Sequence, residues 1–216
     1  MKARITPRPD GPYRLTIEDG SGSATDILRG PGGEAYPVAQ EVFLCRCGAS
    51  KKKPFCDGTH RTNGFTSQPT ADPAANRRTT YVGREITIFD NRAICAHAGV
   101  CTDALKEVFR EEGEPWIDAD GAAVAKMIET IDRCPSGALG YALQAEEAAE
   151  SNGAPTVTVT RDGPYAVMGA VELVDTAFGD GAKRARYTLC RCGASKNKPF
   201  CDGSHWEIQF RDPGPA

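Results

Sequence analysis

Apolar and polar residues alternate in short stretches near both ends of the chain. A period of two is typical of half-buried β-strands, so both ends are predicted to be rich in strands. The apolar positions of these stretches are Tyr13, Leu15, Ile17, Val157, Val159, Tyr165, Val167, Tyr187 and Leu189.

The middle of the chain has a helical pattern instead. Val124, Met127, Ile128 and Ile131 recur at the spacing of one helix face. A second helix is predicted from a cap at Thr102 through Arg110, ending before Gly113. The fold class is therefore α+β, with a mixed unit between two β-rich ones.

The composition indicates small domains that need stabilisation beyond their hydrophobic cores. The chain has 216 residues, with 40% hydrophobic residues, 23 glycines and 15 prolines, which favour turns over long helices. Domains of this kind bury little apolar surface, and disulfides, metals or oligomerisation commonly stabilise them. Nine cysteines are available, an odd number that argues against a disulfide framework and favours metal-bound thiolates.

An internal repeat divides the chain. Residues 44–58 and 189–203 are identical at 14 of 15 positions, and the Asp-Gly-Pro-Tyr turn at residues 10–13 recurs at 162–165. Chance cannot produce such a match, so a module of about 65 residues is duplicated. Two polar stretches, residues 68–78 and 144–155, read as linkers around an insert. The predicted domains are residues 1–68, 76–145 and 153–216.

Both copies carry the spacing C-x-C-x₈-C-x₃-H. The candidate metal ligands are Cys45, Cys47, Cys56 and His60 in the first copy, and Cys190, Cys192, Cys201 and His205 in the second. Zinc also accepts three cysteines and a histidine, but its sites usually pair cysteines as C-x₂₋₄-C.

The strings Cys-Asp-Gly-Thr-His at 56–60 and Cys-Asp-Gly-Ser-His at 201–205, each preceded by C-x-C-x₂-S-x₃-P, resemble the CDGSH iron–sulfur (NEET) family. The first copy departs from the family motif only at Thr59. The resemblance implies one [2Fe–2S] cluster in each copy. Cys45 and Cys47 would hold one iron, Cys56 and His60 the other, and the second copy would match. It also implies two modules that pair within the chain through exchanged strands, with pseudo-two-fold symmetry.

A histidine ligand has chemical consequences for such a cluster. A neutral imidazole in place of a thiolate raises the reduction potential, and protons can displace it. Asp57 and Asp202 are expected to cap a short helical turn that aims each imidazole. Ser50 and Ser195 are expected to be hydrogen-bond donors around the cluster or plain surface serines.

The insert holds the three other cysteines and the third histidine. Cys95, His97, Ala98 and Cys101, followed by Cys134 in a Cys-Pro-Ser-Gly-Ala-Leu string, resemble a divergent mono-cluster ferredoxin. The middle thiolate of the C-x₂-C-x₂-C run is replaced by alanine. The resemblance implies either a [3Fe–4S] cluster on Cys95, Cys101 and Cys134, or a [4Fe–4S] cluster with His97 as fourth ligand. A structural domain with relict cysteines is the alternative.

Charge is unevenly distributed around a net value of −3. Basic residues exceed acidic ones by four in residues 45–61 and by two in 190–205, whereas acids exceed bases by eight in 102–150. The basic segments are predicted either to attract an acidic redox or cluster-acceptor partner or to face the acidic insert. They are too small and too poor in aromatic residues for a nucleic-acid surface.

The sequence as a whole predicts a cytoplasmic three-cluster protein for one-electron transfer or for cluster storage and delivery. Its N-terminus lacks a signal peptide, and no apolar run reaches the roughly 18 residues of a membrane span. It shows no catalytic carboxylate pair, phosphate loop or Rossmann fingerprint, so an enzyme is not predicted, although a subunit of an enzyme complex stays open. We expect a monomer with an internal pseudo-dimer. The alternative is a zinc-stapled structural or interaction protein.

Overall fold

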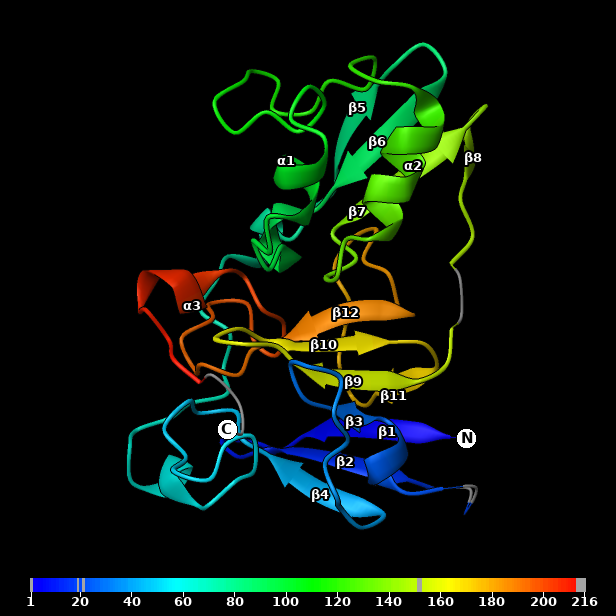
Figure 1. The fold of residues 1–216 in the computed structure, drawn as a ribbon. Helices are drawn as coiled ribbons and strands as arrows, with labels where there is room; N and C mark the ends of the chain where they lie inside the picture. The colour runs from blue at the N-terminus through cyan, green and yellow to red at the C-terminus, as the bar shows by residue number, and fades with distance from the viewer. Residues whose placement is uncertain (1, 19, 21, 151–152, 213–216) are drawn as a thin grey trace.

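A computed structural model describes residues 2–18, 20, 22–150 and 153–212. Figure 1 shows three parts: the N-terminal module in blue to cyan, the insert in green, and the C-terminal module in yellow to red. The C-terminal module lies between the other two. Each part contains a four-stranded sheet, so the predicted α+β class is confirmed.

The first sheet has the strand order β11-β1-β2-β4, and the second has the order β12-β10-β9-β3. The strands of these sheets are β1 (Ala3–Pro7), β2 (Tyr13–Ile17), β3 (Leu28–Arg29), β4 (Glu41–Leu44), β9 (Thr156–Val159), β10 (Tyr165–Met168), β11 (Val171–Leu173) and β12 (Arg186–Leu189). The alternating positions of the sequence lie in β2, β9, β10 and β12 and are buried, as the period of two predicts.

Each of these sheets contains one strand from the other half of the chain. β11 pairs in parallel with β1, with Ile5 opposite Leu173, and β3 pairs in parallel with β9, with Leu28 opposite Val157. All four residues are buried. Because each half completes the sheet of the other, the two modules share one continuous core.

The insert forms a separate antiparallel sheet, β5-β6-β7-β8. Its elements are β5 (Thr79–Val82), β6 (Ile86–Asp90), α1 (Val100–Ala104), α2 (Val124–Asp132), β7 (Leu139–Leu143) and β8 (Glu146–Glu147). The predicted helix over 124–131 is confirmed as α2, which buries Met127 and Ile131. Strand β8 lies within the stretch predicted to be the second linker.

The other predicted helix of the insert is wrong in extent, because α1 ends at Ala104 rather than Arg110. After Val108 the backbone bonds to residues 116–118: the Asp118 amide donates to the Val108 carbonyl at 2.8 Å, and the Arg110 amide donates to the Trp116 carbonyl at 2.7 Å. The chain turns there instead, and Phe109 pairs with Ile117 in an isolated β-bridge.

The remaining helical segments are short. They are α3 (Ser204–Glu207) and the 3₁₀ turns η1 (Ala24–Asp26), η2 (Thr59–Arg61), η3 (Pro73–Ala75) and η4 (Arg92–Ile94). None of the helices in the described part of the chain has the length and apolar character that crossing a membrane requires.

Candidate iron–sulfur sites

In the N-terminal module, the candidate ligands lie on one loop that starts where β4 ends. The Cys45 amide donates to the Pro54 carbonyl at 2.7 Å, and the Cys56 amide donates to the Phe43 carbonyl at 2.8 Å. These bonds close the loop and bring its ends together. The Sγ atoms of Cys45 and Cys47 are 3.9 Å apart, and Cys56 Sγ is 3.4 Å from His60 Nδ1.

The C-terminal module repeats this arrangement after β12. The Cys190 amide donates to the Pro199 carbonyl at 2.8 Å. The Sγ atoms of Cys190 and Cys192 are 3.7 Å apart, and Cys201 Sγ is 3.4 Å from His205 Nδ1. In both copies the four side chains therefore lie as two pairs, one of two sulfurs and one of sulfur with nitrogen.

Ser50 and Ser195 are buried, so the surface reading of these serines is wrong. Their hydroxyls donate to the carbonyls of Phe55 and Phe200, each at 2.7 Å, and close the loop. Burial raises the pKa of the Cys45 thiol to about 11, and a hydrogen bond from the Ser50 backbone N–H acts against this rise. The Ser195 backbone N–H likewise acts to lower the pKa of Cys190.

The aspartates of the motif fasten the loop at two points. Asp57 accepts from the Thr59 amide at 3.0 Å with one oxygen and from the Lys51 amide at 2.8 Å with the other. Asp202 does the same with Ser204 and Lys196. The Thr59 hydroxyl and the two amides hold the Asp57 pKa far below its usual value. The prediction that these aspartates are the N-caps is wrong, because Gly58 and Gly203 occupy the cap positions and no side chain caps either turn.

The two sites differ in their exposure. His205 is 5% exposed and Cys201 is 2% exposed, whereas His60 and Cys56 are only partly buried. Burial lowers the pKa of His205 and raises that of Cys201. The C-terminal site is thus the more protected of two sites with the same ligand types.

Two arginines counted in the basic segments do not lie on the surface. Arg191 is 1% exposed, forms an ion pair with Asp212 and donates to the Gly163 carbonyl at 2.8 Å. Arg46 is 4% exposed, and its guanidinium lies over the Tyr13 ring, 5.0 Å from the centroid. The predicted basic rims are therefore reduced, because each arginine is packed inside its module.

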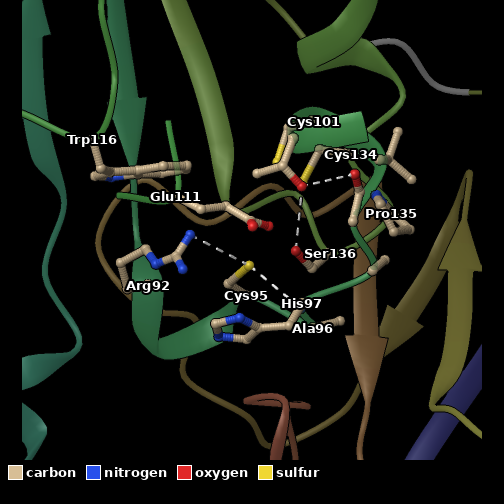
Figure 2. A pocket seen from close by; sticks show the side chains of 14 residues that line it. Arg92, Cys95, Ala96, His97, Cys101, Glu111, Trp116, Cys134, Pro135 and Ser136 are labelled. Atoms are coloured by element: carbon tan, nitrogen blue, oxygen red, sulfur yellow. Dashed lines mark hydrogen bonds between the residues drawn. The ribbon is translucent and has the colours of Figure 1, made fainter. Parts of the chain in front are cut away.

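In the insert, Cys95, Cys101 and Cys134 line one pocket of about 360 Å³, shown in Figure 2. Cys95 follows η4, Cys101 lies in α1, and Cys134 comes between α2 and β7. Burial raises the pKa of Cys95 to about 11 and also raises that of Cys101. A metal that binds these cysteines as thiolates must displace the protons of their thiol groups.

The sequence did not single out several other residues of this pocket as functional. Arg92 lies over the Trp116 ring at 4.4 Å and points an Nη1 atom at Cys95 Sγ, 3.9 Å away. Ser136 Oγ is 3.5 Å from Cys134 Sγ. Only Ser136 could have been found from sequence, since it lies within the Cys-Pro-Ser string.

His97 lines the same pocket, but its ring is engaged elsewhere. Its backbone has a left-handed conformation, φ +52°, and its N–H donates to Cys95 Sγ at 3.4 Å. The imidazole lies against Gly203 of the C-terminal module, where a Cβ atom would come within 2.5 Å of His97 Cδ2.

All nine cysteines are free of disulfides. Within the described residues, no group of three or more His, Cys, Asp or Glu side chains is arranged to hold a single metal ion.

Comparisons with known proteins agree with this arrangement. The family model described as "Iron-binding zinc finger CDGSH type" matches residues 10–61 and 162–206, and the model "Divergent 4Fe-4S mono-cluster" matches residues 81–144. Two relatives from Escherichia coli, strains K12 and O157:H7, both described as "Uncharacterized protein YjdI", are each 43% identical over 61 residues. These residues are 28% of this chain and 80% of each relative. No solved structure matches.

The paired ligands and the family matches define the class: an iron-binding protein with iron–sulfur domains. The chain belongs to the CDGSH iron–sulfur family, with two CDGSH modules and a divergent mono-cluster domain between them.

Proposed function

We propose that this chain is a non-enzymatic three-cluster protein that carries single electrons or stores and delivers clusters. The observation that carries the proposal is the same pairing in both CDGSH loops, two sulfurs within 4 Å and a sulfur 3.4 Å from an imidazole nitrogen. A binuclear cluster takes two protein ligands per iron, so this donor set fits two [2Fe–2S] clusters.

The pairs support the ligand assignment that the family resemblance implies. Cys45 and Cys47 would hold one iron of the N-terminal cluster, and Cys56 with His60 the other. Cys190 and Cys192, and Cys201 with His205, would do so in the C-terminal module. A bound cluster supplies a one-electron couple whose potential the imidazole raises. The chain's contribution is to hold the imidazole nitrogen beside the thiolate and to limit the access of water.

Reciprocal strand exchange supports a pseudo-two-fold pair of modules within the monomer. β11 in the first sheet and β3 in the second are parallel additions from the opposite half. We therefore propose units of residues 1–68, 76–145 and 153–216, in which the outer two fold as one body.

For the central site we propose a [3Fe–4S] cluster on Cys95, Cys101 and Cys134. The three thiols line one pocket, and the middle position of the motif is Ala98. The second candidate is a [4Fe–4S] cluster with His97, which the family description favours. It would require the imidazole to leave its contact with Gly203.

The proposed partner is a redox or cluster-acceptor protein with an acidic surface. Lys51, Lys52 and Arg61 are exposed beside the partly buried His60, which supports docking at the N-terminal site. We propose no nucleic-acid and no membrane partner.

Analysis of iron, zinc and acid-labile sulfide, with electron paramagnetic resonance on anaerobically purified protein, tests the proposal. We expect about seven irons per chain with matching sulfide. Two equivalents of zinc without sulfide would establish the alternative, a zinc-stapled structural protein.

A further inference from the structure

The insert meets the C-terminal module at the residue that follows a proposed ligand. The indole Nε1 of Trp206 donates a hydrogen bond to the His97 carbonyl at 3.1 Å. The His97 imidazole packs on Gly203, which directly precedes α3, the short helix that contains Trp206. A second bond at this boundary runs from the Asn197 side-chain amide to the Ala93 carbonyl, 2.8 Å.

These contacts form a continuous path between Cys95, a proposed ligand of the central site, and His205, a proposed ligand of the C-terminal site. On the insert side, the His97 N–H donates to Cys95 Sγ at 3.4 Å. On the other side, Trp206 follows His205 in the chain, and their rings lie 5.3 Å apart at 37°. From Cys95 to His205 the path thus runs through two hydrogen bonds, the backbone of His97 between them, and an indole ring.

The N-terminal copy lacks this connection. The positions of Trp206 and Ile208 are occupied there by Arg61 and Asn63. Gly58 has nearly the same backbone conformation as Gly203, φ +90° against +89°, but a Cβ on Gly58 would meet open space. Within the described residues, the hydrogen bonds between the insert and a CDGSH loop therefore involve the C-terminal copy, although the motifs of the two copies are almost identical.

The two CDGSH loops also touch each other. A Cβ on Gly48 would come within 2.2 Å of the Cys192 carbonyl oxygen, and one on Gly193 within 2.7 Å of the Cys47 oxygen. The three sites consequently form a series with the C-terminal site in the middle, in the same order as the three parts of the chain in Figure 1.

We propose that Trp206 is an electron bridge between the central site and the C-terminal CDGSH site. This inference rests on the proposed function, since both sites must hold clusters. One electron leaves one site as the other gains it, and no covalent bond forms or breaks. A one-electron donor of the reduced-flavin class supplies the electron. Electron transfer through a protein slows steeply where the path crosses empty space. The Trp206 indole and its hydrogen bond to the His97 carbonyl fill the space between the two sites.

The test uses the full-length protein loaded with its clusters. Photoreduced flavin delivers one electron per chain, and freeze-quenched samples follow its redistribution between the central and terminal paramagnetic signals. Trp206→Phe keeps a ring but removes the N–H donor, and Trp206→Arg installs the residue of the N-terminal copy. We expect redistribution to slow several-fold in the first variant and further in the second.

The indole is 61% exposed, so both variants should keep the iron and sulfide content and the unfolding midpoint of the parent. Ile208→Asn is the matched control, because it also converts an exposed position to its N-terminal counterpart and should leave the rate unchanged. Gly203→Ala disturbs the His97 contact and should slow redistribution, whereas Gly58→Ala carries the same backbone strain and should not.

Unchanged redistribution in cluster-loaded Trp206→Phe and Trp206→Arg would overturn the bridge while leaving the proposed function intact, because only the coupling between sites is measured. Equal slowing in Ile208→Asn would also overturn it. A parent without iron and sulfide refutes the proposed function and the bridge with it.

Discussion

The ring of Tyr13 meets the ring of Tyr165 edge to face, with centroids 6.0 Å apart and planes at 89°. Each hydroxyl reaches into the opposite module. Tyr13 donates to the Cys190 carbonyl at 3.0 Å, and Tyr165 donates to the Cys45 carbonyl at 2.8 Å. Both tyrosines are fully buried. Each module therefore helps to position the first proposed ligand of the other.

Tyr13→Phe and Tyr165→Phe should destabilise both modules together. Either change leaves buried carbonyl groups without their donor, which costs about 1–3 kcal/mol of the free energy of unfolding. Urea unfolding followed by cluster absorbance at both sites measures the effect. Tyr141→Phe, a partly buried tyrosine of the insert, is the control. Loss at only one site would contradict the coupling between modules.

The proposed histidine ligands should make the terminal clusters acid-labile, because protons compete with iron for an imidazole ligand. His60→Cys and His205→Cys should each slow cluster loss in acid and lower the potential of that cluster. Absorbance decay and redox titration measure both effects. In the parent, the N-terminal cluster should be lost first, since His60 is the more exposed imidazole. Decay as fast as in the parent would show that the histidines are not ligands.

Ala98→Cys should add one iron to the central site. A fourth thiolate completes the cube and adds negative charge, so the potential should fall and the oxidised [3Fe–4S] paramagnetic signal of the parent should disappear. His97→Ala separates the two cluster types. It should leave the parent's iron content unchanged if the cluster has three irons, and should create the three-iron signal if His97 is a ligand. Four irons in a parent insensitive to His97 would contradict both.

Asp90→Asn should stabilise the insert at neutral pH. Burial raises the Asp90 pKa to about 6, against partial compensation by the charge of Arg92 and by the Trp116 indole. The folded state thus binds this proton more tightly than the unfolded state does, and stability falls as the pH rises from about 4 to 6. The penalty above pH 6 is about 3 kcal/mol.

Urea unfolding at pH 5 and pH 8 tests this dependence on Asp90. The gain of the asparagine variant over the parent should be larger at pH 8. Asp132→Asn is the control, because Asp132 is exposed at the end of α2. The effect of this substitution on stability should be the same at both pH values. Any loss of clusters in acid affects this variant as well and can be subtracted. A gain that is equal at both pH values would show that the Asp90 charge is not penalised.

Much of each terminal site was predictable because its chemistry is local. The C-x-C and C-x₃-H spacings bring donor atoms within 4 Å by chain connectivity alone, and the duplication placed the second site as soon as the first was recognised. The strands around Tyr13 and Tyr165 followed from their alternating pattern in the same way. The end of α1 was not predictable, because the chain beyond it pairs Phe109 with Ile117, a contact that the local pattern does not encode.

The sequence by itself determined the module order, the two repeated ligand sets and the missing thiol at Ala98, since each is a property of spacing along the chain. Tertiary structure alone decided which strands are exchanged, that Arg46 and Arg191 lie inside, and that His97 faces Gly203. These relationships join residues far apart in sequence. They exist because two small modules can bury enough apolar surface only by sharing a core, and local patterns do not encode which surfaces meet.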